Sequence, residues 1–256
     1  METITSVQNA RVKNWAKLQT RKGRLATSTY LLDGWHLVQE AINHDGKLHA
    51  IMATAQQIAE HEEEFPQGVP VFEIFDDIAK KLSDLKTPQG IFAEVSLPTA
   101  TRDPHFIHDG AWLFLDAIQD PGNVGTMVRT ADAAGFTGVV FGEGSVDLYS
   151  PKALRAMQGS QFHVQTTVGK LEDWTTAFTQ NGLNVYGTQL DPSAADLFTI
   201  EPQTQFAIIM GNEGQGMQPD LAGMTTQNLY IPLAGEAESL NVGVAAGIAM
   251  FALRAR

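Results

Sequence analysis

The 256-residue chain contains no cysteine, so disulfides, iron–sulfur clusters and thiolate zinc sites are excluded. No apolar run approaches the roughly 20 residues needed to cross a bilayer. Residues 1–24 are polar and lack the apolar stretch of a secretory signal. The seven histidines are scattered along the chain. We therefore expect a cytoplasmic protein that binds no metal and does not enter a membrane.

Basic side chains are also scarce, with 17 lysines and arginines against 29 acidic residues and a net charge of −12. A negative net charge argues against a polyanionic partner such as RNA. The basic residues are concentrated in residues 1–24, however, which carry only one acidic residue, Glu2. The basic residues there are Arg11, Lys13, Lys17, Arg21, Lys22 and Arg24. This pattern fits an arm that contacts phosphates and, equally well, a solvated amphipathic helix.

Hydrophobic residues make up 43 % of the chain, and its length suits two domains. Between residues 28 and 97, short apolar runs alternate with helical stretches, which predicts a small α/β domain. The predicted strands are 30–32, 48–53, 69–74 and 91–95, and the predicted helices are 34–43, 55–63 and 76–85. Asp76 or Asp77 is the expected N-cap of the last helix.

Residues 98–110 contain two prolines and no hydrophobic period, so we interpret them as a linker between domains 1–97 and 111–256. A second alternation begins at residue 111. The predicted strands are 112–118, 138–141, 162–167, 183–188, 206–210 and 228–231, and the predicted helices are 125–134, 151–157, 171–179 and 241–253. Strands that alternate with helices indicate a mostly parallel sheet, whose ligand site lies in loops at the carboxyl ends of the strands.

The first of three unusual loops is Asp116–Gly135. Its turn of Asp120, Pro121 and Gly122 leads to Asn123, which is expected to open a helix. Arg129 follows six residues later, near the predicted helix start and on roughly the same side, where a cation can hold a phosphate or ribose. Taken alone, Asn123 is better explained as an N-cap, and Arg129 as a surface residue. The glycines are spaced G-x-x-G, which does not match the dinucleotide fingerprint of a nucleotide-dependent oxidoreductase.

The second loop, Ile208–Met217, has three glycines in six residues after an apolar strand, which lets the backbone pass close to a ligand. Glu213 stands among these glycines, and a solvated turn carboxylate is the alternative interpretation. In the third loop, Leu229–Gly247, a strand ends and a helix of small residues follows. Ser239 is its expected N-cap, and Asn241 has the alternative of being an exposed polar residue.

In their order and content, these three loops resemble the three motifs of the SpoU/TrmH family of RNA 2′-O-methyltransferases, within the SPOUT superfamily. The stretch Tyr149–Ser160 is similar to the family's S-P-x-x-L-R-x-x-x-G-S segment. Residues 1–95 resemble the RNA-binding extension of one branch, which is similar to ribosomal protein L30e. Asp33 departs from the glutamate that is usual in the family, and Gly243 from a common serine.

The resemblance implies a SPOUT domain with a deep trefoil knot, a homodimer, and methyl transfer from S-adenosylmethionine to a ribose 2′-hydroxyl. The implied catalytic residues are Asn123, Arg129, Glu213, Ser239 and Asn241, with Arg129 as base or hydroxyl activator. The implied cofactor-binding residues are Met210, Gly211, Glu213, Gly214, Ile231, Leu233, Ser239, Leu240 and Asn241. The expected RNA contacts are Arg11, Lys13, Arg21, Lys22, Arg24 and Arg155.

The implied substrate is structured RNA, with 23S ribosomal RNA favoured over transfer RNA. Two alternatives stay open at this point: a transfer RNA 2′-O-methyltransferase, and a non-catalytic RNA-binding protein that keeps the fold. The complete set of implied catalytic residues argues against the second alternative.

Overall fold

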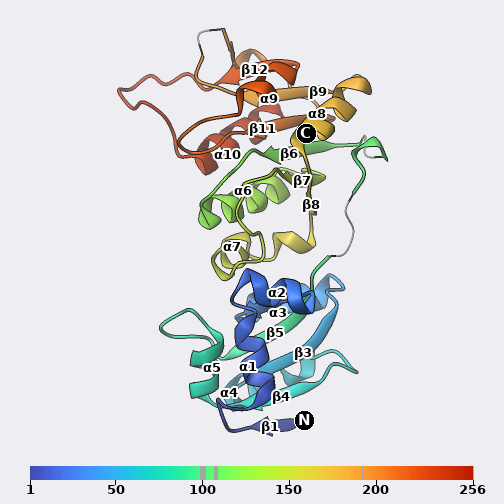
Figure 1. The fold of residues 1–256 in the computed structure, drawn as a ribbon, viewed down its shortest axis with the longest axis vertical. Helices are drawn as coiled ribbons and strands as arrows, with labels where there is room; N and C mark the ends of the chain where they lie inside the picture. The colour runs from blue at the N-terminus through green and yellow to red at the C-terminus, as the bar shows by residue number, and fades with distance from the viewer. Residues whose placement is uncertain (99–101, 107–108, 192, 256) are drawn as a thin grey trace. The chain divides into compact units, whose positions relative to one another are not determined.

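The computed structural model describes residues 1–98, 102–106, 109–191 and 193–255. The chain forms two compact units (Figure 1), of which unit 1 comprises Met1–Thr99 and Asp147–Phe162, and unit 2 comprises Ala100–Val146 and His163–Arg256. Part of the predicted linker, residues 99–101 and 107–108, lies outside the described residues. No helix found in the described ranges is long and apolar enough to cross a membrane.

In the part of unit 1 that the structure describes, five strands form one sheet in the order β1-β4-β3-β5-β2. Strands β1, β4 and β3 run parallel, and β5 is antiparallel to both β3 and β2. The strands are β1 (Glu2–Ile4), β2 (Thr29–Asp33), β3 (Leu48–Ala53), β4 (Val71–Ile74) and β5 (Ile91–Ser96). The helices are α1 (Ala10–Lys17), α2 (Arg21–Thr27), α3 (Trp35–Asn43), α4 (Ala55–His61), α5 (Asp76–Leu82) and α7 (Pro151–Met157).

The N-terminal residues are part of this unit's core. Trp15 on α1 is buried, its ring lies 5.3 Å from that of Phe72 on β4, and its indole nitrogen donates a 3.0 Å hydrogen bond to Glu94 on β5. Strand β1 adds a parallel edge to the sheet next to β4. Apart from the buried Arg24, the basic residues of this segment are exposed on α1 and α2, so the structure supports a solvated helical surface, the second of the two interpretations, over an arm.

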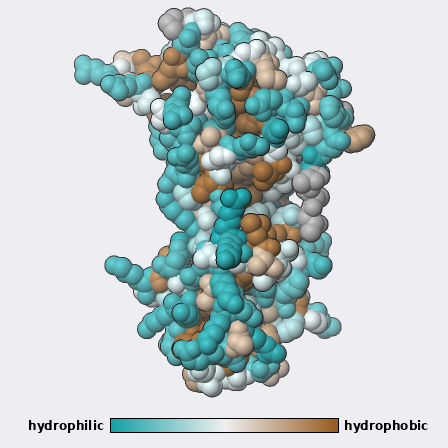
Figure 2. Space-filling model, viewed as in Figure 1, coloured by the Kyte–Doolittle hydropathy of each residue, from teal (hydrophilic) through white to brown (hydrophobic). Residues whose placement is uncertain are grey.

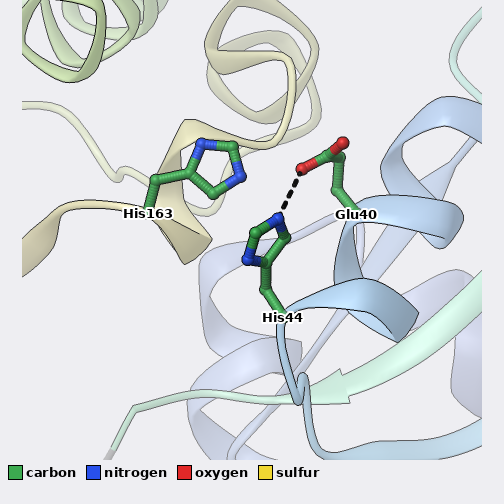
Figure 3. A group of neighbouring side chains, drawn as sticks. All are labelled: Glu40, His44 and His163. Atoms are coloured by element: carbon green, nitrogen blue, oxygen red, sulfur yellow. Dashed lines mark ion pairs between the residues drawn. The ribbon is translucent and has the colours of Figure 1, made fainter.

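The end of α3 is held by a local ion pair. His44, the C-cap residue, follows Glu40 by one helical turn, and its Nε2 lies 3.4 Å from the Glu40 carboxylate (Figure 3). The backbone N–H of His44 also donates to the Glu40 carbonyl, at 3.1 Å. Surface pairs of this spacing contribute well under about 1 kcal/mol, so the pair closes the last turn without fixing the fold.

Unit 2, over its described residues, contains a seven-stranded sheet in which every neighbouring pair is parallel, in the order β10-β12-β9-β11-β6-β7-β8. The strands are β6 (Ala111–Leu115), β7 (Gly138–Phe141), β8 (Gln165–Val168), β9 (Asn184–Thr188), β10 (Ala195–Asp196), β11 (Phe206–Met210) and β12 (Gln227–Tyr230). The helices are α6 (Pro121–Ala133), α8 (Leu171–Gln180), α9 (Pro219–Met224) and α10 (Val242–Leu253).

The central strands β6 and β11 are buried along their whole length. Successive side chains of a strand point to opposite faces, so this burial shows that both faces of the sheet are covered. On one side the covering includes an aromatic cluster in which Trp112 and Phe114 of β6 pack against Trp174 and Phe178 of α8. The predicted parallel α/β sheet is confirmed. The surface facing the viewer in Figure 2 is mainly hydrophilic, as the acidic composition leads us to expect.

Several predicted boundaries are wrong in an informative way. Helix α6 begins at Pro121, with Asp120 as its N-cap, four residues before the predicted start. Phe75, and not an aspartate, precedes α5, while the two aspartates occupy its first turn. The strand expected at 162–167 begins only at residue 165, after a 3₁₀ turn at Ser160–Phe162. The elements β1, α1, α2, β10 and α9 were not predicted, and of these β1, β10 and α9 are too short to show a hydrophobic period.

Candidate active site

A cavity of about 720 Å³ opens in unit 2 beyond the carboxyl ends of β9, β11 and β12. These strands are neighbours in the sheet and all run parallel, so the loops that follow them meet at one edge. The volume lies within the range of small-molecule and cofactor sites. Sheet topology alone therefore places a ligand-sized cavity where the glycine-rich loops converge.

The cavity brings together every residue that the sequence suggested for cofactor binding. The residues that line it from this set are Met210, Gly211, Glu213, Gly214, Ile231, Leu233, Ser239, Leu240 and Asn241. They come from the β11–α9 loop and the β12–α10 loop, which are far apart in sequence. The second and third loops thus form two walls of one cavity, while their contact with a cofactor remains a prediction.

Another wall of the cavity was not predicted from the sequence. Thr188, which ends β9, lines the cavity with the next two residues, Gln189 and Leu190, and with Leu197 from a 3₁₀ turn. The Thr188 hydroxyl donates a 2.9 Å hydrogen bond to the Ile209 carbonyl, which ties this wall to β11. The only available signal was that the residues follow a predicted strand, and the sequence does not show that this strand lies between β11 and β12.

The β11–α9 loop is a tight hairpin. Asn212 and Gly216 exchange two backbone hydrogen bonds of 3.0 and 2.9 Å, and the Asn212 side chain accepts from the backbone of Gly214 and Gln215. At Gly211 a Cβ atom would lie 2.2 Å from the backbone nitrogen of Met217, a distance that no side chain allows. The loop therefore has its shape fixed before any ligand binds.

Three of the candidate catalytic residues form one chain of hydrogen bonds. Asn123 on α6 donates from Nδ2 to the Glu213 carboxylate at 3.1 Å, and its Oδ1 accepts from Nδ2 of Asn241 at 3.0 Å. The Glu213 carboxylate also accepts from the backbone nitrogens of Gln119 and Asp120, each at 3.2 Å. The assignment of side-chain N and O in these amides follows from the hydrogen-bond pattern. All three sequence loops are joined by this network.

The network decides between the alternatives that the sequence left open. Asn123 lies inside α6 and is not its N-cap, and the carboxylate of Glu213, although exposed in a turn, is hydrogen-bonded to the start of α6. The N-cap of α10 is Asn241, whose Oδ1 accepts from the backbone of Gly243 and Val244. The N-cap prediction for Ser239 is therefore wrong, although Ser239 does line the cavity.

Glu213 is held in its charged form. Partial burial raises the pKa of this carboxyl, but the hydrogen bonds donated by Asn123 and by the backbone at Gln119 and Asp120 outweigh that effect, so the pKa of Glu213 lies below its ordinary value. The carboxylate is thus ionised throughout the neutral range and places a fixed negative charge at the rim of the cavity.

We expect Glu213→Gln to lower the free energy of unfolding by about 1 kcal/mol at pH 7. The NH2 group of the glutamine would face an N–H donor in place of an accepting carboxylate oxygen, and the site is solvent-exposed, which keeps the loss small. Because the pKa of Glu213 is lower in the folded protein than in the unfolded chain, its stabilisation is present above the unfolded value and is lost as the pH falls through the folded one. Urea denaturation at several pH values should show the difference shrinking below about pH 4.

Glu236→Gln is the matched control for that comparison, since it removes an exposed carboxylate from the neighbouring loop. Its stability should follow that of the wild type across the same pH range. A Glu213→Gln difference that is constant with pH would show that the carboxylate charge does not stabilise the loops.

Arg129 is exposed on α6 and makes no hydrogen bond or ion pair with any residue that the structure describes. It is the ninth residue of the helix and lies about a third of a turn around the axis from Asn123, so the expected placement near the helix start and on the same side is wrong. Arg129 is also absent from the residues that line the cavity. The geometry leaves this guanidinium free to act on something outside its own chain.

The candidate RNA contacts divide into engaged and free residues. Arg24 is buried, donates to Asp147 at 2.6 Å and to the Leu18 carbonyl at 2.6 Å, and so its predicted RNA contact is replaced by a structural one. Arg155 forms two hydrogen bonds with Asp84, at 2.6 and 2.9 Å, which hold the pKa of that carboxyl below its usual value.

Arg11 is half-exposed, pairs with Glu2 at 2.6 Å and lies over the Phe72 ring. Lys13, Arg21 and Lys22 are exposed and have no partner within the described ranges. Of the six candidate RNA contacts, these three are the ones that can meet a phosphate without breaking an interaction within the described residues.

The chain is similar to known proteins along almost its whole length. The model of the SpoU rRNA Methylase family matches residues 110–251, and that of the MRM3-like substrate binding domain matches residues 9–93. The 23S rRNA (guanosine(2553)-2′-O)-methyltransferase RlmP of Bacillus subtilis (strain 168) is 39 % identical over 254 residues, which cover 99 % of this chain and 100 % of that protein.

Two solved structures are similar over almost the whole chain. A putative RNA methyltransferase of the TrmH family from Porphyromonas gingivalis is 32 % identical with a TM-score of 0.87, covering 97 % of this chain and 99 % of its own. The AdoMet-bound rRNA methyltransferase from Sinorhizobium meliloti is 29 % identical with a TM-score of 0.86, covering 98 % of this chain and 97 % of its own. Both the cavity-bearing unit and the N-terminal unit are thus shared with these proteins.

Proposed function

Because the chain belongs to the SpoU rRNA Methylase family, we propose that it transfers a methyl group from S-adenosylmethionine to a ribose 2′-hydroxyl of 23S ribosomal RNA. The observation that carries the proposal is the cavity in which the second and third loops meet, joined to α6 through Asn123. A relative that matches end to end is named as a 23S rRNA 2′-O-methyltransferase, which favours ribosomal RNA over transfer RNA.

The residues around the cavity suit this cofactor. Apolar side chains of Leu197, Ile231 and Leu240 offer contact area for an adenine ring, and the backbone at Gly214 and Gly216 has open space beside it, which lets a ligand approach closely. The ionised Glu213 lies at the rim of the same cavity, where a negative charge suits a cationic ligand. When bound, the cofactor supplies a methyl group on a good leaving group.

The protein then has two tasks, which are to align the 2′-hydroxyl with that methyl group and to remove its proton. Asn123 and Asn241 hold the loops in register for the first task. Arg129 is our candidate for the second. An arginine is normally protonated, so Arg129 acts here by stabilising the developing alkoxide, while the hydroxyl proton passes to an RNA phosphate oxygen as the methyl group is transferred.

We propose that Arg129 reaches the cavity of a second copy of the chain. It does not line its own cavity, and α6, which carries it, packs against α10. Helix α10 exposes Val244 and Phe251, which lie seven residues and thus about two turns apart on one face. A homodimer through this face covers both side chains and completes the site. We further propose a trefoil knot in unit 2 and a cytoplasmic location.

The test is methyl transfer from labelled S-adenosylmethionine to unmodified 23S rRNA and, separately, to transfer RNA, followed by nucleoside mass spectrometry. A 2′-O-methylated nucleoside in the ribosomal RNA alone is the expected result. A product in transfer RNA alone would replace the proposed substrate with the alternative one. Cofactor binding without transfer to either RNA, or to ribosome precursors, would favour a non-catalytic RNA-binding protein.

We expect replacement of Lys13, Arg21 and Lys22 by alanine to weaken RNA binding at least tenfold at physiological salt, with S-adenosylmethionine affinity unchanged. For each phosphate that the variant no longer neutralises, the slope of log K against log salt should fall by about 0.7 to 0.9. Filter binding over a salt series measures both quantities. Lys170→Ala, which removes an exposed cation from unit 2, is the control, and an unchanged slope in the triple variant would contradict the role of these residues.

A further inference from the structure

Asp116, the residue directly after β6, is an unusual buried carboxylate. It is 1 % exposed and has no cationic partner in the part of the chain that the structure describes. Both of its carboxylate oxygens accept hydrogen bonds from one residue, Gln218: the backbone nitrogen at 2.7 Å and the side-chain Nε2 at 2.6 Å. A buried carboxylate is costly unless hydrogen-bonded, and these short charge-assisted bonds offset that cost.

The hydrogen-bond partners of Asp116 lie at the two ends of the β11–α9 loop. Its own backbone nitrogen donates to the Met210 carbonyl at 2.9 Å, immediately before the β11–α9 loop begins. Its carboxylate holds Gln218, immediately after the cavity-lining residue Met217. Asp116 is therefore hydrogen-bonded to both ends of the loop that forms a wall of the cavity.

The next residue supports the middle of the same loop. The Ala117 carbonyl accepts a 2.7 Å hydrogen bond from Nδ2 of Asn212. Ala117 has φ +53°, a left-handed conformation that is disfavoured for any residue with a Cβ atom. The chain adopts this conformation where it meets the loop, which is typical of a backbone held in place by surrounding contacts.

We infer that Asp116 is a positioning residue, which holds the β11–α9 loop in its cofactor-binding shape through its paired hydrogen bonds with Gln218. Asp116 does not line the cavity, so it acts on the cofactor only through the loop. The inference rests on the proposed function for the identity of the cofactor. The geometry of the β11–α9 loop itself does not depend on which cofactor binds.

The pairing of Asp116 with Gln218 can be tested by exchanging the carboxylate and the amide between the two positions. In Gln218→Glu, two carboxylates face one another, and the loop should be released. In Asp116→Asn, the Gln218 amide can rotate by 180° and accept from the new amide, so the effect should be small. In the double variant, which combines these two substitutions, the new amide accepts from the backbone nitrogen and donates to the new carboxylate. Both hydrogen bonds are then restored, with the charge moved to a more exposed position.

Calorimetry with S-adenosylhomocysteine should show Gln218→Glu binding at least about 10-fold more weakly than the wild type, and Asp116→Asn and the double variant within about 3-fold of it. The KM for S-adenosylmethionine should rise in Gln218→Glu while kcat changes little. Gln227→Glu, which adds the same charge at an exposed position on β12, is the control. A double variant as weak as Gln218→Glu, or a Gln218→Glu protein that binds normally, would overturn the inference.

Hydrogen exchange separates this inference from the proposed function. The amides of Asn212 and Gly216 are hydrogen-bonded across the loop, so their protection reports its shape without any ligand. Protection should disappear in Gln218→Glu and return in the double variant. If no variant and not even the wild type binds S-adenosylhomocysteine, the proposed cofactor is wrong, whereas unchanged protection in Gln218→Glu would refute the role of Asp116.

Discussion

Arg129→Lys is expected to lose at least about 100-fold in kcat while it binds S-adenosylmethionine as tightly as the wild type does, because activation of the attacking hydroxyl by a positioned group contributes on the order of 10² to 10⁴ in rate. Lysine keeps the charge but cannot hold a phosphate through two parallel N–H groups. The exposed guanidinium has no partner among the described residues, so its loss should leave stability unchanged. Single-turnover methyl transfer at saturating cofactor measures the effect.

Near-normal turnover in Arg129→Lys would end the proposed role of this arginine. The control is Arg254→Lys, which alters another arginine of unit 2 that donates to the carbonyls of Gly135 and Thr204. Its turnover should match that of the wild type, even if its melting temperature falls slightly. The comparison therefore separates loss of the reaction from loss of packing.

The same arginine gives a test of the proposed homodimer. Arg129→Ala and Gly211→Ala should each be inactive, the first through its arginine and the second through its cavity. If the arginine of one copy serves the cavity of the other, a mixed dimer has one complete site, and random assortment of two chains restores about a quarter of the wild-type activity. If each arginine instead serves the cavity of its own chain, the mixed dimer has no complete site and the mixture should remain inactive.

Gly211→Ala is expected to weaken S-adenosylmethionine binding by about 10- to 100-fold. The added methyl would lie 2.2 Å from the backbone nitrogen of Met217 and 2.5 Å from the carbonyl carbon of Gly216, and neither atom belongs to a side chain that can turn away. The β11–α9 loop must therefore open, and strain of this kind typically costs on the order of 1 to 3 kcal/mol even after relaxation. Calorimetry with the cofactor measures the loss.

Gly223→Ala is the matched control for this substitution. It adds the same methyl on α9, where a Cβ atom would meet nothing within 4 Å, and alanine favours a helix over glycine. We expect unchanged affinity and a small gain in stability. A Gly211→Ala protein with a wild-type melting temperature and wild-type cofactor affinity would show that the close approach in the loop is not required.

The parts of the fold that the sequence predicts well are those dictated by continuous local patterns. Strand β11 is five apolar residues in a row, and the helix at Pro151–Met157 begins with a serine and a proline, so both were predicted with correct ends. The order of strands in the sheet is a non-local property. This explains why Thr188 at the end of β9 and the two residues after it were not recognised as a wall of the cavity.

Side-chain environments were the second limit. Residue type predicted that Arg24, Arg129 and Arg155 were available cations, but the structure shows one buried, one free and one bound to a carboxylate. Burial and partners depend on residues more than 70 positions away in sequence, such as Asp147 for Arg24 and Asp84 for Arg155. No count of charges along the chain contains that information.

The assignment of Asp147–Phe162 to unit 1 has a consequence for how such proteins can be recombined. A chimaera that joins residues 1–97 of this chain to residues 111–256 of a relative would place a foreign α7 against Asp84 and β2, although α7 is encoded within the methylase half. The contacts of α7 therefore depend on matching residues from both halves of the sequence. A viable exchange of specificity between relatives has to transplant α7 together with the N-terminal unit, as two separate pieces of the gene.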